Sequence, residues 1–378
     1  MNFEIKKEVF LHYLLQIQKI LPQKTFFPMY YCIKMDLKQN VLFLEVNNDH
    51  IVVKIKIEDE SLKVQEEGVL VVLGKNFVDI IKKIDYSFIK IISVEDKFLI
   101  LKTDTSQYKL KIMDLNSYPL INFDFDYQNF FQIKTELFKK IIKETSIISS
   151  KDKQKNVLTG VNLIYESPFL TVIATDSFRL AQKKLELNID YHDFNIIIPG
   201  KSLEELIKLL EQKKDDIVQI SITKQKFFLQ TNSLFFQSSL LEGNYPRFPS
   251  IKKENLVHFF KLNRNNLIKV LDRVSLFLPK EKNFIDNVVE FKISSNNKLE
   301  ISSDSEEIGN ALEEFEILEF SFVDEIRTFF NVKYLEEILK IFSSETITFF
   351  FENPSKPFLI MCEEDETILY LIFPFYFK

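Results

Sequence analysis

The segment FQIKTELFKKIIKETSI, residues 131–147, runs from an extended stretch directly into an amphipathic helix. Apolar residues alternate with polar ones at its start, as in a half-buried strand, and then recur at the three- and four-residue spacing of a helix. The same pattern precedes two more predicted helices, so that the three helices span 8–20, 135–147 and 264–277. The extended stretches begin at Phe3, Phe131 and Phe259, each 128 residues after the previous one. A fixed period predicts three copies of one structural plan.

Two further signals recur at nearly the same interval. An apolar strand, a short break and a second amphipathic helix follow one another, and the first lysines of these helices are Lys75, Lys201 and Lys333. An aromatic residue followed by proline closes each repeat, at 118–119, 245–246 and 373–374. The three signals predict three domains, 1–125, 126–252 and 253–378.

Short runs of β-branched and aromatic residues lie between the two helices of each repeat, at 41–46, 51–57, 163–165, 170–174 and 288–293. Turn-forming clusters separate them, for example 38–40 and 294–297. Short strands joined by turns are typical of an antiparallel meander. Each domain is therefore predicted to be an α+β unit, with two helices packed on antiparallel sheet.

Composition excludes several classes of protein. The chain is 46% apolar and 28% charged, has no apolar run near the roughly 20 residues of a membrane span, and begins without a signal peptide's apolar region. We therefore expect a cytoplasmic, globular protein with no membrane partner. The six glycines are too far apart for a phosphate-binding loop, and the four histidines show no metal-ligand spacing. We expect no cofactor and no metal, and we expect Cys32 and Cys362 to be buried reduced thiols.

The second helix of each repeat carries two lysines, seven residues apart, opposite its apolar face. In the first repeat Lys75 and Lys82 oppose Phe77 and Ile81. The matching pairs in the other repeats are Lys201 with Lys208 and Lys333 with Lys340. The first helices of the second and third repeats add Lys139, Lys140, Lys143, Lys269 and Arg273. A charged outer face is ordinary for one surface helix, but its threefold recurrence favours a function.

Acidic residues gather instead in loops and at predicted sheet edges, at 58–60, 304–307, 313–319 and 363–366. The net charge of −6 tells against a tight, static nucleic-acid binder, because such proteins are usually basic and gain affinity by releasing counterions from many phosphates. An acidic protein with basic helices is compatible with a function in which the protein surrounds DNA and binds it only loosely. Strong phosphate contacts would hinder its movement along the duplex.

The segment ATDSFRLA, residues 174–181, resembles the A-T-D-x-x-R-L-A hallmark of the β subunit of bacterial DNA polymerase III, the sliding clamp family. Residues 242–246 resemble the family's G-x-[FY]-P segment, 330–335 its F-N-x-x-Y-L helix start, and 371–376 its apolar-Pro-apolar tail. The resemblance covers essentially the whole chain.

The resemblance implies a DNA clamp fold without a catalytic site: a homodimer closed head to tail, which encircles duplex DNA of any sequence and holds the replicative DNA polymerase on it. A clamp loader ATPase is the other implied partner. The implied dimer interface comprises Lys75, Tyr108, Leu276 and Phe277. The residues predicted to face DNA are Lys24, Lys75, Lys82, Lys139, Lys140, Lys143, Lys201, Lys208, Lys269, Arg273, Lys333 and Lys340.

The resemblance also implies a pocket between the second and third domains, into which partners insert short apolar peptides. Its residues would be Leu158, Thr175, Arg179, Leu180, Pro246, Ile251, Asn331, Tyr334, Ile372, Phe373 and Pro374. The chain departs from the family pattern around this pocket, at Lys155, Ser177, Phe178, Ser250 and 373–376. The peptide preference therefore stays open. A purely structural alternative for Asp176 and Arg179 is that they pair and satisfy the backbone of one turn.

Two other classes of protein remain as alternatives. A hydrolase or transferase on repeated α+β domains would need acidic groups such as Asp176 and Asp304 to converge in one deep pocket. A scaffold that binds only proteins would have its lysine pairs scattered over outer surfaces rather than facing one shared surface.

Overall fold

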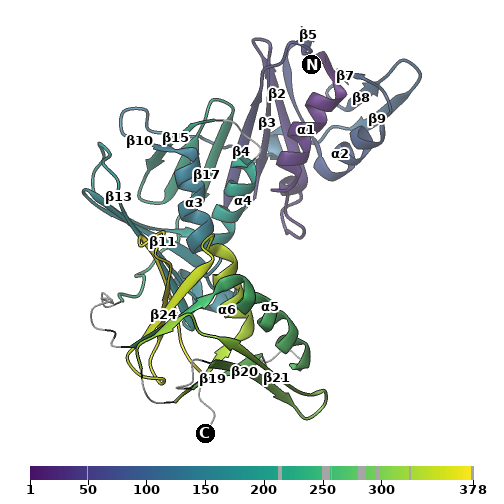
Figure 1. Ribbon diagram of the computed structural model, residues 1–378. Coiled ribbons are helices and arrows are strands. Elements are labelled where there is room, and N and C mark those ends of the chain that lie inside the picture. The colour runs from purple at the N-terminus through teal and green to yellow at the C-terminus, as the bar shows by residue number, and fades with distance from the viewer. Residues whose placement is uncertain are drawn as a thin grey trace. The chain divides into compact units, whose positions relative to one another are not determined.

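The computed structural model describes residues 1–48, 50–211, 215–248, 256, 258–279, 287–294, 298–322 and 325–375 (Figure 1). Two compact units are present. The first comprises Met1–Lys139, Ile189–Tyr191 and Lys201–Leu240, and the second comprises Lys140–Asn188, His192–Gly200 and Leu241–Lys378. No helix in the described part of the chain is long and apolar enough to cross a membrane.

The described helices occur in pairs, two for each predicted repeat. They are α1 (Lys7–Gln18), α2 (Gly74–Lys83), α3 (Thr135–Ser146), α4 (Gly200–Leu210), α5 (Arg264–Val274) and α6 (Val332–Ile341). Each begins at the residue after a strand, as the strand-to-helix patterns predicted. In α5 and α6 an asparagine supplies the missing acceptor at the helix start: the side chain of Asn263 accepts from Asn266 N, and that of Asn331 accepts from Tyr334 N.

The first unit contains two antiparallel sheets. The five-stranded sheet has the order β5 (Lys63–Glu66), β1 (Asn2–Lys6), β7 (Phe88–Val94), β8 (Phe98–Lys102), β9 (Gln107–Lys111). The eight-stranded sheet has the order β10 (Phe131–Lys134), β15 (Ile217–Ile222), β16 (Lys226–Gln230), β17 (Leu234–Ser239), β4 (Ile51–Ile57), β3 (Val41–Asn47), β2 (Cys32–Lys38), β6 (Gly68–Leu73). Helices α1 and α2 pack together, and the ring of Phe10 contacts those of Phe3 and Phe77.

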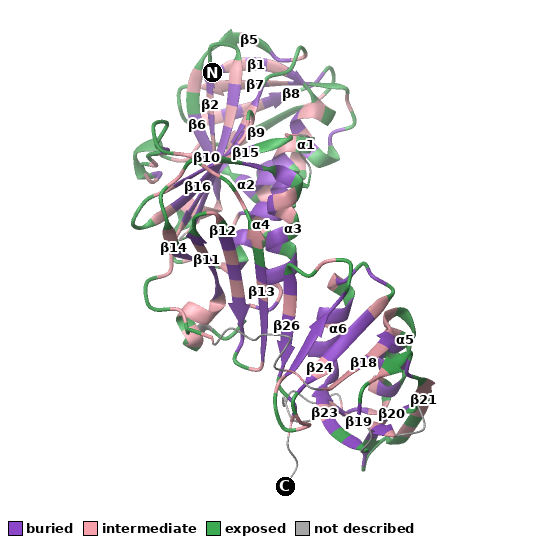
Figure 2. Cartoon of the chain, turned by 60° about the vertical axis from the view of Figure 1, so that its left-hand side comes forward, coloured by how far each residue is buried: buried purple, intermediate pink, exposed green. Residues whose placement is uncertain are grey.

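The second unit also contains two antiparallel sheets. The nine-stranded sheet has the order β14 (Phe194–Pro199), β11 (Gly160–Glu166), β12 (Phe169–Thr175), β13 (Arg179–Glu186), β26 (Ile368–Ile372), β25 (Phe358–Met361), β24 (Thr346–Phe351), β18 (His258–Asn263), β22 (Glu319–Phe320). The four-stranded sheet has the order β21 (Gly309–Glu316), β20 (Lys298–Ser305), β19 (Val288–Ser294), β23 (Ile326–Asn331). Figure 2 shows β24 and β26 mainly buried, which places them in the core.

The sheets do not follow the predicted domain boundaries. Strand β17 of the second repeat pairs with β4 of the first, with Phe236 opposite Val53. Similarly, β13 of the second repeat pairs with β26 of the third, with Leu180 opposite Leu371. The edge strands of successive repeats form backbone hydrogen bonds with each other. The hydrogen-bonded sheets therefore continue across the predicted domain boundaries. The α+β class is confirmed, and successive repeats share their antiparallel sheets.

A buried charge network joins the second repeat to the third. The Lys183 side chain, 3% exposed, donates to Asp365 Oδ2 at 2.9 Å, and its ammonium lies 2.7 Å from Glu144 Oε2. That Glu144 oxygen accepts no hydrogen bond within the described residues, so the contact is an ion pair. Lys140 also binds Asp365, at 2.7 Å, and the Tyr370 hydroxyl donates to the backbone oxygen of Glu144. Lys183 is the deeply buried cation of this network, whereas the Lys140 side chain, 54% exposed, reaches Asp365 from the surface.

Both cysteines are free and buried, as predicted. Burial raises the pKa of the Cys32 thiol to about 11. A thiol with this pKa stays protonated at neutral pH and is a poor nucleophile.

Candidate functional site

The turn between β12 and β13 is organised by Asp176. Its Oδ1 accepts hydrogen bonds from the backbone N–H of Phe178 and Arg179, and its Oδ2 accepts from Arg179 Nε at 3.0 Å. Ser177 takes a positive φ of 85° at the tip of the turn. The predicted pairing of Asp176 with Arg179 is confirmed, and it shapes the turn locally.

Arg179 reaches from this turn to the start of α6. Its Nη2 donates to Glu337 Oε2 at 2.6 Å, its Nη1 donates to the backbone oxygen of Tyr334, and its guanidinium lies 4.3 Å from the Tyr334 ring centre. The residue is only 4% exposed. Glu337 was not among the residues predicted for the site. A guanidinium bound to one carboxylate still needs partners for its remaining donors, and this requirement was the signal that pointed to a second acceptor.

Three nearly parallel rings lie next to this ion pair. The Phe178 ring lies 6.1 Å from that of Tyr334 and 6.2 Å from that of Phe375, at interplanar angles of 28° and 12°. The Lys155 ammonium lies 5.1 Å from the Phe178 ring centre and donates to the backbone oxygen of Asp176. Burial, with a smaller contribution from Asp176, raises the pKa of the Tyr334 hydroxyl, which therefore remains neutral. We call Tyr334, Phe178 and Phe375 the ring stack.

The chain that follows β26 reaches the same place. Phe373 N donates to the backbone oxygen of Phe178 at 3.0 Å, and Phe375 N donates to that of Phe329 at 2.9 Å. Residues 373–375, which we call the C-terminal arm, therefore run from the β12–β13 turn to β23. Pro374 is buried between these two attachments.

An apolar cluster lies behind the turn. Leu180 packs in it with Leu359, Met361 and Leu371, and the half-buried side chains around it include Phe248 and Leu256. The segment containing Pro246 is tied to the same region, because the Tyr245 hydroxyl accepts from the backbone N–H of Thr175 at 3.1 Å. Segments distant in sequence thus meet around one turn.

The described residues of the predicted peptide pocket differ in their exposure to solvent. Seven are buried by the chain itself: Thr175, Arg179, Leu180, Asn331, Tyr334, Ile372 and Pro374. Leu158 is half-buried, whereas Phe373, 40% exposed, and Pro246 are open to solvent. Ile251, like the variant positions Ser250 and Tyr376, lies outside the described residues. Asn331 caps α6, so its side-chain oxygen is already engaged. Among the described pocket residues, a ligand can reach mainly Phe373 and Pro246, and the half-buried rings of Phe178 and Phe375 are partly accessible.

The three lysine pairs, on α2, α4 and α6, are all exposed. They lie on the helix face opposite buried side chains such as Phe77, Leu206 and Leu335. Two of them form ion pairs on their own helix, Lys208 with Glu205 and Lys340 with Glu336. Such exposed pairs contribute little stability. The cations therefore remain available to a polyanion.

The other predicted basic residues are more varied. Lys24, Lys143 and Lys269 are exposed. Lys140 is also exposed but pairs with Asp365, and Arg273 forms a bidentate pair with Glu313. The prediction that Lys139 lies on an open face is wrong, because its side chain is 12% exposed and pairs with Glu136. The Lys139 ammonium turns back to Glu136, one turn earlier on α3, and does not extend into solvent.

In each unit a predicted interface residue lies on, or next to, an edge strand of a sheet. In the first unit β9 has a neighbour on one side only, and Tyr108, Lys109 and Lys111 along it are exposed. In the second unit β21 is likewise an edge, with Leu312 62% exposed. Leu276, 70% exposed, lies in the 3-10 helix Ser275–Phe277 that contacts β21. Phe277 is half-buried, and Lys75 is exposed at the start of α2.

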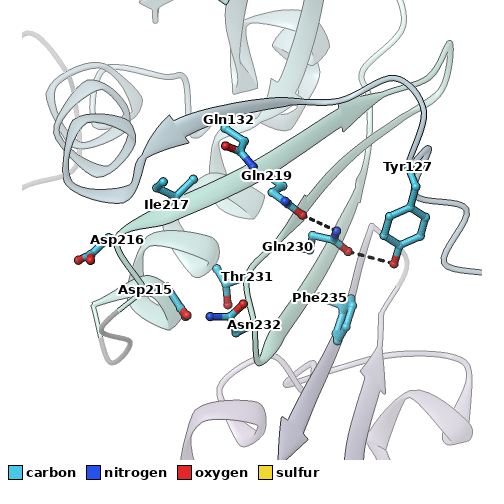
Figure 3. A pocket seen from close by; sticks show the side chains of 10 residues that line it. All are labelled: Tyr127, Gln132, Asp215, Asp216, Ile217, Gln219, Gln230, Thr231, Asn232 and Phe235. Carbon is cyan, nitrogen blue, oxygen red and sulfur yellow. Dashed lines mark hydrogen bonds between the residues drawn. The ribbon is translucent and has the colours of Figure 1, made fainter.

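A separate cavity of about 590 Å³ lies in the first unit, on strands β10, β15, β16 and β17 (Figure 3). Gln230 Nε2 donates to Gln219 Oε1 at 2.7 Å, and the Tyr127 hydroxyl donates to Gln230 Oε1 at 3.3 Å. Its other lining residues are Gln132, Asp215, Asp216, Ile217, Thr231, Asn232 and Phe235. This mainly polar cavity contains none of the predicted site residues.

The acidic groups singled out for an enzyme do not meet. Asp176 follows β12 of the nine-stranded sheet and binds Arg179, whereas Asp304 lies exposed on β20 of the four-stranded sheet. Within the described residues, no group of three or more His, Cys, Asp or Glu side chains could hold a metal ion. The arrangement supplies binding surfaces and gives no support to the hydrolase alternative.

Comparison with known proteins agrees with the three repeats. Models of the DNA polymerase III beta subunit match the chain in order: the N-terminal domain over residues 1–122, the central domain over 132–247 and the C-terminal domain over 252–376. The beta sliding clamp of Staphylococcus epidermidis is 31% identical over 380 residues, and that of Bacillus subtilis is 30% identical over 381 residues. In both cases 99% of each chain is covered.

Solved structures agree over the full length. A crystal structure of the DNA polymerase sliding clamp from Bacillus subtilis superposes with a TM-score of 0.91 at 28% identity, and that of the DNA polymerase III beta chain from Streptococcus pneumoniae with 0.92 at 26%. Both cover 100% of this chain and of the solved one. The family models together span nearly all of the sequence, and so the chain belongs to the DNA polymerase III beta subunit family, the beta sliding clamps.

Proposed function

We propose that this chain is a DNA sliding clamp that holds the replicative DNA polymerase on duplex DNA in the cytoplasm and has no catalytic activity of its own. The observation that carries the proposal is the match of all three repeats, over nearly the whole chain, to the sliding clamp family. The proposed domains are 1–125, 126–252 and 253–378.

The working form is a homodimer closed head to tail. The exposed edge β9 carries Lys109 and Lys111, and the exposed edge β21 carries several glutamates, including Glu316. Unpaired strand edges join readily with another strand, and opposite charges favour the contact of β9 in one copy with β21 in the other. A contact between two different surfaces closes into a ring when its rotation allows.

Duplex DNA of any sequence passes through this ring. The exposed lysine pairs of α2, α4 and α6 supply a weakly attractive lining. Ring closure prevents dissociation, so few phosphate contacts are needed, and few contacts allow movement along the duplex. A protein-only scaffold would lack this DNA retention.

The polymerase and the clamp loader ATPase bind through short apolar peptides at the proposed pocket. Phe373 and Pro246 are its exposed apolar members, and the Leu180 cluster lies beneath the turn. An apolar recess with a few fixed polar groups is the usual form of a site that anchors one or two side chains.

The function is tested by loading the purified protein onto nicked circular duplex with its loader ATPase. We expect the protein to stay on the circle in high salt and to leave once the circle is cut, because only ring closure survives screening of the phosphate contacts. The bound fraction is measured by gel filtration before and after linearisation. Equal loss from circular and linear DNA would rule out a closed ring.

The pocket is tested by a Pro246→Ala, Phe373→Ala double variant. Both residues are exposed, so the change removes contact surface without opening the core. We expect polymerase stimulation to fall at least tenfold, as losing two anchors of roughly 1 kcal/mol each predicts, while retention on circular DNA persists. Phe169→Ala, which removes another exposed ring in the same unit, is the control. Full stimulation by the double variant would refute the pocket.

A further inference from the structure

We propose that a polar cavity of about 210 Å³ on strands β3, β4, β16 and β17 binds a small oxyanion that carries an O–H group, a ligand of the hydrogen phosphate class. We call this the boundary cavity, because it lies where β17 of the second repeat pairs with β4 of the first. Its lining includes Asn47, Asn48, Val52, Lys226, Gln237 and Ser239. The inference goes beyond the proposed function, which gives this place no role.

The boundary cavity has the same position in the first repeat as the predicted peptide pocket has in the second. Asn48 Oδ1 accepts hydrogen bonds from the backbone N–H groups two and three residues later, and so does Oδ1 of Asp176, 128 residues further along the chain. Four residues after each of them, the partner on the neighbouring strand is Gln237 in one case and Leu371 in the other. An amide therefore replaces a leucine of the apolar cluster, and the first site suits a polar ligand.

Gln237 is the polar group that the fold leaves unsatisfied. It is only 7% exposed, and its Oε1 has no hydrogen-bond partner within the described residues. A buried amide oxygen without a donor keeps the full cost of its removal from water, so buried polar groups in native proteins nearly always have a partner. The cavity that Gln237 lines has about seven times the volume of one water molecule. It therefore has room for a small ligand that donates to Oε1.

The charge around the cavity favours an anion. Lys226 lines it and has no ion pair within the described residues, and no aspartate or glutamate is among its described lining residues. The side chains of Asn47, His50 and Asn122 add N–H donors. An ammonium group with several N–H donors binds the oxygens of an oxyanion. Because Gln237 also requires a donor, hydrogen phosphate fits better than a carboxylate, which carries no proton at neutral pH.

A bound anion also contacts the connection between the first two repeats. Residues 120–122 line the cavity opposite the strand residues, and the ring of the next residue, Phe123, lies 6.5 Å from that of Phe228 and 6.0 Å from that of Phe235. The ligand thus joins this segment to the eight-stranded sheet. A ligand that binds only the folded state raises the melting temperature.

The test measures binding of inorganic phosphate to the full chain by isothermal titration calorimetry, with sulfate as the matched anion. Sulfate has the same shape but carries no proton at neutral pH, so it cannot donate to Gln237. We expect phosphate to bind with one equivalent per chain and at least about tenfold more tightly than sulfate, the effect of one hydrogen bond to a charged group. Glycerol phosphate, whose hydroxyls supply the O–H group, shows whether a phosphate monoester binds more tightly than the free ion.

Two variants test the residues that carry the proposal. Gln237→Leu, which introduces the residue type of Leu371, should weaken phosphate binding at least about tenfold. Without phosphate it should be at least as stable to urea as the wild type, because it removes a buried unsatisfied group. Lys226→Met should also weaken phosphate binding at least about tenfold. Lys224→Met, which removes an exposed lysine outside the cavity, is the control and should bind as the wild type does.

The outcomes that overturn the proposal are distinct from those that test the proposed function. A folded wild type without saturable phosphate binding overturns it, as do equal effects of phosphate and sulfate that persist in both variants. A Gln237→Leu variant that is less stable than the wild type in phosphate-free buffer overturns the assignment of Gln237 as the unsatisfied group. Retention on circular DNA is measured separately and should be unchanged in all three variants, so a failed phosphate titration leaves the clamp function standing.

Discussion

Replacing Leu276 and Leu312 with lysine is expected to convert the protein into a monomer and to abolish its retention on circular DNA. Both side chains are largely exposed, at 70% and 62%, and both belong to the region of the β21 edge. Large exposed apolar residues beside an unpaired edge strand are characteristic of an interface.

Lysine acts here in two ways. It removes apolar surface that the interface would bury, and it adds positive charge opposite Lys109 and Lys111 of β9 in the partner copy. Like charges brought together in an interface cost several kcal/mol. In the proposed ring, closure alone would retain the protein on DNA in high salt, so loss of the dimer is expected to remove retention entirely rather than partially.

The measurement is mass by light scattering coupled to gel filtration, followed by the circular DNA assay. The wild type should have twice the 44.8 kDa chain mass and the variant the mass of one chain. Leu318→Lys is the matched control, since Leu318 is 56% exposed but lies outside β21. A double variant that remains dimeric and retained would place the interface elsewhere.

Lys183→Ala is expected to lower the free energy of unfolding by about 3–5 kcal/mol at neutral pH, the usual effect of removing one partner from a buried ion pair. The Lys183 side chain is 3% exposed and lies between Glu144 and Asp365. Its loss leaves Glu144 and Asp365 with Lys140 as the remaining cation of the described network. The free energy is measured by urea denaturation.

Lowering the pH should reduce the difference in unfolding free energy between the wild type and Lys183→Ala. Burial by itself raises the pKa of Asp365, but hydrogen bonds from Lys140, Thr367 and Lys183 outweigh it and hold the pKa well below its usual range. A carboxylate with a depressed folded-state pKa stabilises the fold above its unfolded pKa of about 4, and this contribution is lost as the pH falls. The wild type and Lys183→Ala should therefore begin to converge as the pH falls below about 4–5, and they should continue to converge well below pH 3, because the contribution of Asp365 is lost only as the pH reaches its depressed folded-state pKa.

Lys356→Ala is the control for this variant. Lys356 pairs with Glu352 at the surface, with its side chain 54% exposed, so its loss should cost less than about 1 kcal/mol. If Lys183→Ala were as stable as Lys356→Ala, the network would contribute nothing to holding the second and third repeats together.

Much of the local structure followed from the sequence. The strand-to-helix junctions at Lys134–Thr135 and Asn331–Val332 depend on spacing within about ten residues, and the structure has helices at both. The pairing of Asp176 with Arg179 was predictable for the same reason, because both lie in one turn. Lys139 was misplaced because helical spacing does not specify how far the buried stripe extends on either side.

The sequence by itself determined the three repeats, the α+β class, the exposed lysine pairs and the family, since each depends on residue order within a short segment or on a motif. Only the tertiary structure decided which strand edges join, as β17 with β4 and β13 with β26. It also brought Lys183 to Asp365, Arg179 to Glu337 and Phe178 to Phe375, across at least 150 residues in each case. Such partners are selected by long-range backbone pairing and by the need to neutralise buried charge, and neither requirement leaves a periodic signal in the chain.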